Sequence, residues 1–522
     1  MGGNNSRIDT RSGYRNAPPL NAGNDYADSV VTSEIDEVGM LGRFIRFFEE
    51  KADRARALSV RTRFIIAEMC GLAIVWPLPH TIALRNALMV MLFATLFSQV
   101  SWKMAGEIAW GPLRKVTVFY VAFTLWILVG AIFISPFHHW SLGEIRGQWL
   151  GGFAALLIGA ACALQKDARV ASAIVVVSLS IFVVQIVAVD LQGLWLVAHS
   201  GAWSHMARVG GLTAGPGKAS YLTNFLLSGL VAELSLRMEG SHSQLWSSWR
   251  LGTLLLLCFV SIYFESMRNE IFDIGIFSGF VGVVGYRAQR GRAARRTLLL
   301  VAGSVVVVVI TASLDLALDP RWQTLWATIP VALDTTHHLA WLNAQRYPLP
   351  HLPNGQVVSA SNYLRVAWIK EGLRTVIRYP LGVGYGRSAF GHALRLRFGD
   401  AATTMGLNNS LLTVAIGTGI PGTLLWLGWF WSMARFSFTR VTGKHAFAAR
   451  FSLLIILAFG VRMCLDNVMQ NYTLEQFMFL VGLLFPLSLG AGAPNYGVRV
   501  CEKGRDPSRS KPDAITSGAT PH

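Results

Sequence analysis

The chain has 522 residues, of which 52% are hydrophobic and only 14% are charged, and its formal net charge is +17. Its apolar residues form runs of about 20, long enough to cross roughly 30 Å of hydrocarbon as helix. This composition excludes a soluble globular protein. In a membrane protein the positive charge does not indicate nucleic-acid binding, because cationic loops fix the orientation of the chain in the membrane.

Both ends of the chain are polar. Residues 1–60 begin as a tail rich in Gly, Asn, Ser and Asp and end in a basic flank, and residues 491–522 have a similar tail composition. The N-terminal segment does not show the pattern of a cleaved signal peptide. We predict that both are disordered tails on the cytoplasmic side.

The apolar runs predict an all-α polytopic membrane protein with about twelve transmembrane helices, nine within residues 61–314 and three within residues 407–490. The predicted spans begin near Phe64, Leu84, Val116, Trp149, Ser172, Ala219, Leu251, Ile271, Leu298, Leu407, Phe451 and Leu474. With the N-terminus inside, every predicted cytoplasmic loop carries at least two Lys or Arg, as in 287–296. This distribution satisfies the positive-inside rule with both termini in the cytoplasm.

One predicted outer loop is far longer than the others. Residues 315–406 separate spans nine and ten, contain tryptophans and prolines, and carry a net charge of +4. Loops of this length are usually functional or disordered, and this composition favours a folded, partly helical periplasmic unit. The excess of arginine and lysine calls for an anionic partner, such as lipid headgroups or a phosphate-bearing substrate.

Within that loop, residues 361–380 predict an amphipathic helix. Apolar residues from Leu364 to Ile377 recur at helical spacing, and Lys370, Arg374 and Arg378 share another face because they lie four residues apart. Ser361 is the predicted N-cap. The helix could lie on the membrane with its cations toward headgroups, or it could face a substrate.

Three further clusters of polar residues lie at the predicted outer ends of spans. The turn 263–275 carries Arg268, with Asp273 one turn deeper and placed to orient an arginine. The loop 205–217 carries Arg208 beside several glycines. Around residues 461–471, Arg462 and its neighbours favour structural hydrogen bonding between helices. Ionisable groups at membrane depth are costly, and their gathering on one side predicts one outward-facing polar site.

The stretch 406-GLNNSLLTVAIGTGIPGTLLWLGWF-430 begins with two amides and continues as an apolar run. Asn408 and Asn409 would stand at its outer edge. The glycines at 417, 419 and 422 would allow the helix to approach a neighbour closely. No His, Cys or carboxylate cluster has metal-ligand spacing, and Cys70, Cys162, Cys258, Cys464 and Cys501 match no redox motif, so we expect neither a metal nor a cofactor.

These features together resemble the superfamily of O-antigen ligases and Wzy-type polymerases. The resemblance rests on about twelve spans with one large late outer loop, on the run 365-RVAWIKEGLRTVIRYPLGVGYGRSAF-390, and on paired polar residues followed after nine residues by Gly-x-x-Gly. It covers roughly residues 200–480. It differs at Asn408, where the ligase branch has a histidine, and asparagine cannot act as a base near neutral pH. The difference favours the polymerase branch.

The resemblance implies a metal-independent glycosyltransferase at the periplasmic face of the bacterial inner membrane. Its donor would be an undecaprenyl-diphosphate-linked oligosaccharide, and its pathway partners would include a flippase and a chain-length regulator. By this resemblance, Arg208, Arg268, Asn408 and Asn409 would be catalytic. The residues that would bind substrate are Arg365, Arg374, Arg378, Tyr385, Arg387, His337 and His338.

Three alternatives remain open on the sequence. A purely structural subunit of an envelope assembly would not need outward arginines flanked by glycines. An O-antigen ligase would need another base in place of Asn408, and a loop histidine such as His392 could supply it. A transporter or flippase of lipid-linked sugars would also have about twelve spans and intramembrane charges. It would more often show internal symmetry, charges near the midplane and no 90-residue outer loop.

Overall fold

The computed structural model describes residues 59–165, 168–200, 208–213, 215–239, 245–288, 324–469 and 471–491, with isolated positions between 303 and 322. The predicted tails and the ninth span, near Leu298, lie almost wholly outside these residues. By its internal contacts the chain divides into residues 1–63 and residues 64–522. The described chain is helical, and its only β-type pairings are two isolated bridges, Val100 with Gln165 and His351 with Val357.

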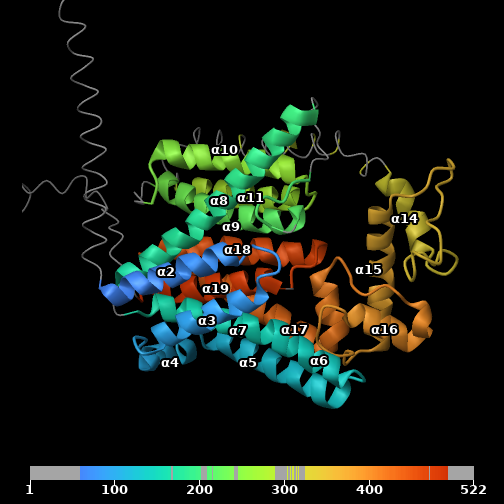
Figure 1. The fold of residues 1–522 in the computed structure, drawn as a ribbon, viewed down its shortest axis with the longest axis horizontal. Helices are drawn as coiled ribbons and strands as arrows, with labels where there is room; N and C mark the ends of the chain where they lie inside the picture. Colours follow the sequence, from blue (N-terminus) through green and yellow to red (C-terminus); the bar gives the residue numbers. More distant parts are fainter. Residues whose placement is uncertain are drawn as a thin grey trace, which may run out of the picture. The chain divides into compact units, whose positions relative to one another are not determined.

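The helices follow the predicted order (Figure 1). Those before the long loop are α2 (Val60–Val75), α3 (Ile82–Phe97), α4 (Trp102–Trp110), α5 (Arg114–Val129), α6 (His138–Glu144), α7 (Leu150–Ala163), α8 (Ala168–Ser200), α9 (Pro216–Met238), α10 (Ser248–Glu265) and α11 (Glu270–Ala288). Those of the loop and beyond are α14 (Leu325–Leu333), α15 (Ala360–Arg378), α16 (Ala389–Phe398), α17 (Ser410–Phe438), α18 (Ala446–Leu465) and α19 (Asn471–Ser488).

In the described part of the chain, seven helical stretches are long and apolar enough to cross a membrane. They are Arg114–Ile134, His138–Ala163, Val170–Ser200, Pro216–Met238, Ser248–Glu265, Ser410–Phe438 and Ala446–Leu465. α3 and α19 are apolar but shorter. These helices fit a multi-pass membrane protein and confirm the all-helical prediction.

Close backbone contact joins α7 to α19. A Cβ added to Gly159 would lie 2.9 Å from the amide nitrogen of Leu483, and one added to Gly482 would lie 3.0 Å from the carbonyl carbon of Leu156. Small residues at such a crossing let two helices pack backbone against backbone, which is how membrane helices associate without a hydrophobic driving force. α9 lies at the centre of its neighbours, and almost its whole length is buried.

The long loop has a hydrophobic core of its own. Buried residues of α15 and α16, such as Tyr363 and Phe390, gather with Trp341 and with Leu412 and Ile416 of α17. The loop is therefore folded, as predicted, and its core extends past residue 406 into α17. Helix α15 matches the predicted helix, although Ser359 takes the N-cap position in place of Ser361.

The buried face of α15 differs from the predicted apolar face. Tyr363, Ala367 and Glu371 are buried, whereas Leu373 and Ile377 are exposed. The residues of the predicted apolar pattern lie on two faces of α15. The loop core covers one face, and the stripe Ile369, Leu373 and Ile377 on the other face is exposed. An exposed stripe of this kind, spaced four residues apart, suits contact with the membrane interface.

Helix α17 is broken at Gly419, whose φ of 68° and ψ of −172° lie outside the helical region. The segment 380–384 runs alongside the break. Val383 N–H donates to Ile416 O at 3.1 Å, Gly384 N–H to Gly417 O at 2.9 Å and Ile420 N–H to Pro380 O at 2.8 Å. These bonds satisfy buried backbone groups that the break removes from the helix.

Two of the predicted glycines of α17 have a loop segment as their close neighbour, and the third has a helix. A Cβ on Gly419 would overlap Pro380 O, and a Cβ on Gly417 would lie 2.8 Å from Gly384 O. A Cβ on Gly422 would lie 2.8 Å from Cδ1 of Trp126 in α5, which agrees with the prediction of close helix packing. Large apolar side chains are exposed along α17 only from Ile420 onward. The part suited to face lipid thus begins thirteen residues after the predicted start near Leu407, and residues 420–438 still extend about 28 Å.

Candidate functional site

The predicted polar clusters on the outer side come together through direct contacts. Val209 N–H donates to Phe264 O at 3.2 Å, which ties the loop of Arg208 to the end of α10. The Nη2 atom of Arg208 lies 3.8 Å from the Sδ of Met267. Arg208 is exposed at this junction, and Met267 directly precedes Arg268 in the chain.

Two residues at this junction adopt left-handed backbone conformations. Arg208 has a φ of 46° and Ser266 has a φ of 49°. Residues other than glycine rarely adopt such angles, and they persist where the surrounding structure holds them. In the described part of the chain, His80 is the only other non-glycine residue with positive φ. Local strain at functional sites is a known pattern, so its occurrence beside two arginines marks this junction as a candidate site.

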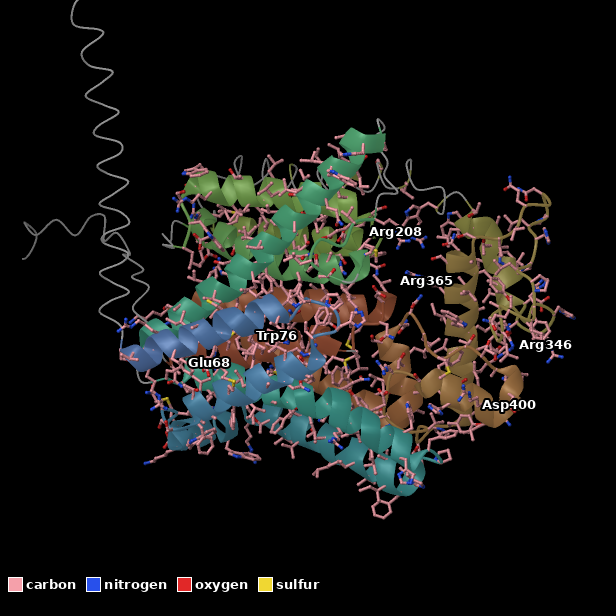
Figure 2. All side chains as sticks on the ribbon, viewed as in Figure 1. Glu68, Trp76, Arg208, Arg346, Arg365 and Asp400 are labelled. Carbon is pink, nitrogen blue, oxygen red and sulfur yellow. The ribbon has the colours of Figure 1, made fainter. Side chains whose placement is uncertain are left out.

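Arg268 joins the α10–α11 turn to the folded long loop between α11 and α17, which we call the loop unit. Its guanidinium donates from Nη1 to Asn362 Oδ1 at 2.9 Å and from Nη2 to Ser361 Oγ at 3.2 Å, and it lies 5.4 Å from the ring centroid of Trp322. Arg365 is one turn further along α15 and projects on the side toward the bundle (Figure 2). Three separate segments thus bring Arg208, Arg268 and Arg365 to the same edge.

Arg462 lies beneath this edge and is fully buried. Its Nε donates to Asp273 Oδ2 at 2.7 Å and its Nη1 to Ser220 Oγ at 2.6 Å. Asn224 donates to the same Asp273 oxygen at 2.6 Å. These bonds connect α9, α11 and α18, and they confirm the predicted structural role of Arg462 and the prediction that Asp273 orients an arginine. A buried charge held this way fixes the helices that carry the arginines above it.

Asn409 has a structural role that the sequence did not suggest. It is the N-cap of α17: its Oδ1 accepts from Leu412 N–H at 2.8 Å, and its Nδ2 donates to Cys464 O at 2.7 Å. Both ends of the amide are therefore used within the protein. Asn408, by contrast, is exposed at the start of the same helix. Of the two predicted amides, Asn408 is the one placed to meet a ligand.

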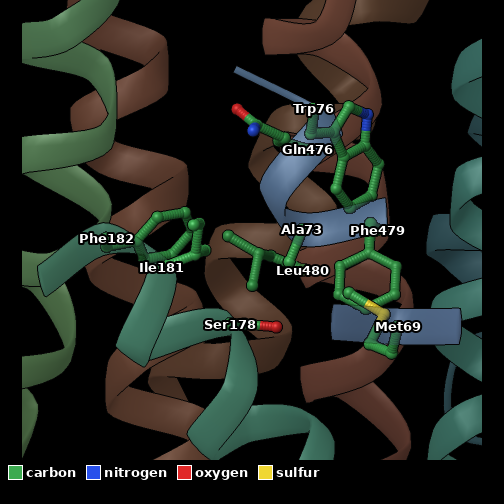
Figure 3. Close-up of a pocket in the computed structure, with 9 residues that line it drawn as sticks. All are labelled: Met69, Ala73, Trp76, Ser178, Ile181, Phe182, Gln476, Phe479 and Leu480. Atoms are coloured by element: carbon green, nitrogen blue, oxygen red, sulfur yellow. The ribbon is translucent and has the colours of Figure 1, made fainter. Parts of the chain in front are cut away.

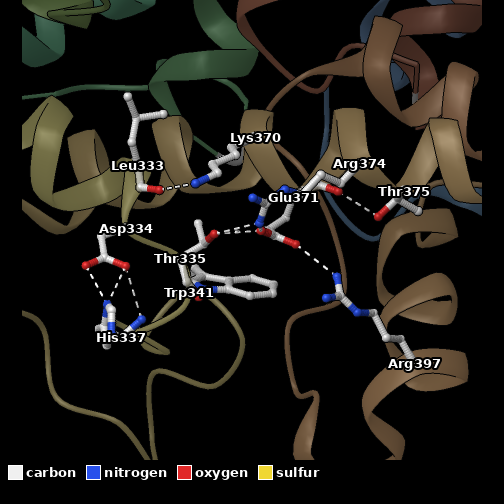
Figure 4. Close-up of polar contacts among 10 residues, drawn as sticks. All are labelled: Leu333, Asp334, Thr335, His337, Trp341, Lys370, Glu371, Arg374, Thr375 and Arg397. Atoms are coloured by element: carbon white, nitrogen blue, oxygen red, sulfur yellow. Dashed lines mark hydrogen bonds and ion pairs between the residues drawn. The ribbon is translucent and has the colours of Figure 1, made fainter.

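The loop unit contains a second cationic group, organised around Glu371. The buried carboxylate accepts from Arg374 Nη1 at 2.6 Å and Thr335 Oγ1 at 2.6 Å through Oε1, and from Arg397 Nη1 at 3.1 Å through Oε2 (Figure 4). The side chains of Arg374 and Arg397 remain 48% and 37% exposed. Both guanidinium groups are thus held in place while part of each still faces solvent.

Other predicted binding residues are scattered. Tyr385 is buried, with its ring 6.0 Å from that of Trp149, so it contributes to the core and offers no open face to a sugar. Burial raises the pKa of the Tyr385 hydroxyl. Arg387 is exposed and pairs with Glu144 at 3.4 Å, and Arg378 is exposed on the last turn of α15.

The two predicted histidines are close in sequence and differ in environment. His337 is exposed, and its Nδ1 lies 2.8 Å from Asp334 Oδ2. The hydrogen bond from His337 lowers the pKa of the Asp334 carboxyl. His338 is half-buried, and its carbonyl accepts a 2.8 Å bond from Tyr363 Oη. Burial raises the pKa of Tyr363 to about 12.

Removing the Glu371 carboxylate should weaken the loop unit. In Glu371→Ala two guanidinium groups and Thr335 lose their shared acceptor, and we expect the free energy of unfolding to fall by about 2 to 3 kcal/mol. The measurement is a denaturant or thermal unfolding curve of the full chain in detergent. Asp400→Ala removes an exposed carboxylate of the same loop and should change stability by less than about 0.5 kcal/mol. Equal effects of the two variants would contradict the role of Glu371.

His392 is a loop histidine with an apolar environment. Its ring centroid lies 4.0 Å from that of Trp140 and 4.5 Å from that of Phe137, and in the described chain its buried Nδ1 has no hydrogen-bond partner. Burial, with a smaller contribution from the positive charge of Arg395, lowers the pKa of this imidazole below its usual value. The folded state therefore favours neutral His392.

This environment predicts a pH dependence of stability. Because the folded pKa is below the unfolded value of about 6.5, the unfolded state binds more protons as pH falls through 6.5, and stability should be lost there. We expect the melting temperature of the native chain to fall more between pH 7.5 and pH 5 than that of His392→Gln. Parallel curves for the two proteins would show that protonation of His392 does not oppose folding.

One cavity inside the bundle is too small to hold a substrate. The cavity has about 10 Å³ of space, room for a single water, and is lined by residues of α2, α8 and α19, among them Trp76, Phe182 and Gln476 (Figure 3). Its lining is mostly apolar, and its size excludes it as a candidate site. The polar edge at Arg208, Arg268 and Arg365 remains the best candidate.

The sequence pointed to Arg268, Arg374 and Arg387 as site residues, but not to the side chains that bind them in the folded protein. Nothing in the sequence marked Ser361, Asn362 or Glu144 as an arginine partner, because each is an ordinary polar residue until folding brings it to an arginine. Glu371 had a signal, since it precedes Arg374 by three residues on one helix. Arg397 had none, because it reaches Glu371 from another helix.

A scan against protein-family models finds no family that matches this chain, and no curated protein matches its sequence. The resemblance to O-antigen ligases and Wzy-type polymerases therefore stays a prediction.

Proposed function

We propose that this chain polymerises polyprenyl-diphosphate-linked oligosaccharide repeat units at the periplasmic face of the bacterial inner membrane. The observation that carries the proposal is the convergence of Arg208, Arg268 and Arg365 from three segments, two of them meeting at a strained junction. Arginine is suited to phosphate because its planar guanidinium donates two parallel hydrogen bonds.

In the proposed reaction an acceptor hydroxyl attacks the anomeric carbon of the donor saccharide. The bond between that carbon and the diphosphate oxygen breaks, and the carrier lipid leaves with its diphosphate. The hydroxyl proton passes to water or to a neighbouring base. Arg208 and Arg268 would stabilise the negative charge that develops on the leaving phosphates. Asn408, exposed at the start of α17, would orient the acceptor by hydrogen bonding.

The proposed topology has twelve spans with both termini in the cytoplasm. Eleven of the predicted starting points fall on or immediately beside described helices, and the ninth lies outside the described residues. In this arrangement the loop unit is periplasmic. The exposed stripe of α15 would lie on the outer leaflet, and the arginines held by Glu371 would guide the anionic donor or its product.

Deleting the protein tests the proposal against its alternatives. We expect the cell to lose long surface polymer and to accumulate single repeat units on the carrier lipid at the periplasmic face. Full-length chains stranded on the carrier lipid would instead indicate a ligase. Repeat units trapped on the cytoplasmic leaflet would indicate a flippase. Normal polymer and normal carrier-linked saccharides would reject all three functions.

A further inference from the structure

A basic groove lies between the N-terminal end of α5 and the C-terminal end of α17. It has a volume of about 660 Å³ and is lined by Arg114, Lys115, Arg435 and Arg440, together with aromatic and aliphatic side chains. The groove is near the opposite end of α17 from Asn409 and Gly419. It is therefore separate from the candidate site at Arg208 and Arg268.

The cations of the groove have no acidic partner in the part of the chain that the structure describes. Arg114, Lys115 and Arg435 are exposed. Arg440 is half-buried and fixed: its Nη1 donates to Phe436 O at 3.0 Å, and its guanidinium lies 3.9 Å from the Phe436 ring centroid. Four gathered positive charges repel one another unless an anion is present.

The start of α5 also favours an anion. Its first turn contains Arg114 and Lys115 and no acidic residue, and Leu113 at the N-cap position has no side chain that could cap the helix. Cations at a helix N-terminus oppose the helix dipole, whereas a bound anion complements it. This arrangement is therefore unfavourable for an empty groove and favourable for an occupied one.

The rest of the lining is suited to hydrocarbon. Trp431 and Val118 line the groove and are exposed, and they continue the apolar surface that α17 and α5 present along Leu427, Leu424, Val121 and Leu125. A ligand in the groove would thus meet charge at one end and a lipid-facing surface at the other. A soluble phosphate would use only the first of these features.

We propose that this groove binds the headgroup of an anionic phospholipid, with an acyl chain lying along α5 and α17. Basic pockets between membrane helices are known to bind anionic headgroups, and each Lys or Arg near such a surface contributes about a fivefold gain in affinity. The lipid would fix the crossing of α5 and α17, where the Phe119 ring lies directly on Gly428.

The test is lipid retention by the full-length chain in detergent, measured by native mass spectrometry with phosphatidylglycerol and phosphatidylcholine of identical acyl chains. We expect tighter retention of phosphatidylglycerol by the native chain. The double variant Arg435→Gln, Arg440→Gln should lower that affinity about 25-fold. The matched double variant Arg346→Gln, Arg395→Gln removes the same charge from exposed positions of the loop unit and should change it less than about twofold.

Elution profile and unfolding temperature establish that each variant is folded. If Arg435→Gln, Arg440→Gln does not fold, Arg114→Gln, Lys115→Gln replaces it, because both side chains are exposed at the start of α5. Equal retention of the two lipids, or undiminished retention by the folded groove variants, would overturn the proposal. Complete displacement of phosphatidylglycerol by millimolar inorganic phosphate would also overturn it, since the groove would then be a site for soluble anions.

Discussion

The variant Gly419→Ala should not reach the native structure in normal yield. Gly419 has a φ of 68° and a ψ of −172°, and a Cβ at this position would overlap the carbonyl oxygen of Pro380. Relief of the overlap would require Pro380 to withdraw, which would break the bond from Ile420 N–H to Pro380 O. We expect a loss of about 3 kcal/mol or more in the free energy of unfolding. Thermal unfolding in detergent and the fraction of monodisperse protein measure it.

Gly130→Ala is the matched control for this prediction. Gly130 directly follows α5, the helix that packs against α17. Gly130 has helical backbone angles, and a Cβ added to it would have no neighbouring atom within 4 Å. The substitution should leave stability unchanged or raise it by up to about 1 kcal/mol, since alanine restricts the unfolded chain more than glycine does. A Gly419→Ala protein as stable as Gly130→Ala would show that the break in α17 is not required.

Arg268→Ala should abolish surface polymer while the protein remains present in the membrane. Loss of one preorganised donor to a developing negative charge typically lowers the rate on the order of a hundredfold or more. Arg268→Lys should retain only part of the activity, because an ammonium keeps the charge without the planar pair of donors. The measurement is polymer length and amount in cells that carry each variant, with protein levels followed by immunoblot.

A structural role for Arg268 must be separated from a catalytic one. The double variant Ser361→Ala, Asn362→Ala removes both side-chain partners of Arg268 in α15 and keeps the guanidinium. If Arg268 only tethers α15 to the bundle, this double variant should lose polymer to the same degree and with the same fall in melting temperature. If Arg268 meets the phosphates, the double variant should keep a substantial part of the activity. Arg346→Ala, which removes an exposed arginine of the loop unit, should behave like the native chain.

The sequence predicted the helical architecture well because membrane helices are marked by continuous apolar runs. The predicted starts near Val116, Ala219 and Phe451 all fall on described helices. It also predicted the helix α15 and a folded long loop. The predicted apolar face of α15 was correct only in part. Leu364, Trp368 and Val376 pack against the loop core, whereas Leu373 and Ile377 are exposed. The hydrophobic pattern of a short helix does not reveal which side meets the core and which side meets lipid.

Contacts between distant segments were beyond local reasoning. The glycine-rich run after Pro380 and the glycines of α17 are about 35 residues apart, and each was visible as a separate motif. Their pairing depends on φ angles that only glycine adopts readily, at Gly382 and Gly419 together. Similarly, Asn409 looked like a ligand-binding amide because its partner, Cys464 O, is supplied by another helix.

The interruption in α17 also has a consequence for biosynthesis. The carbonyl and amide groups around Gly417 and Ile420 acquire their partners from residues 380–384. In the proposed topology these residues belong to the periplasmic loop, so they would already have been exported when α17 emerges from the ribosome. The tenth span could not then be completed as a lone helix during insertion. It would be finished only when the exported segment folds back against it, so maturation of the loop unit and of this span would be a single, late step in assembly.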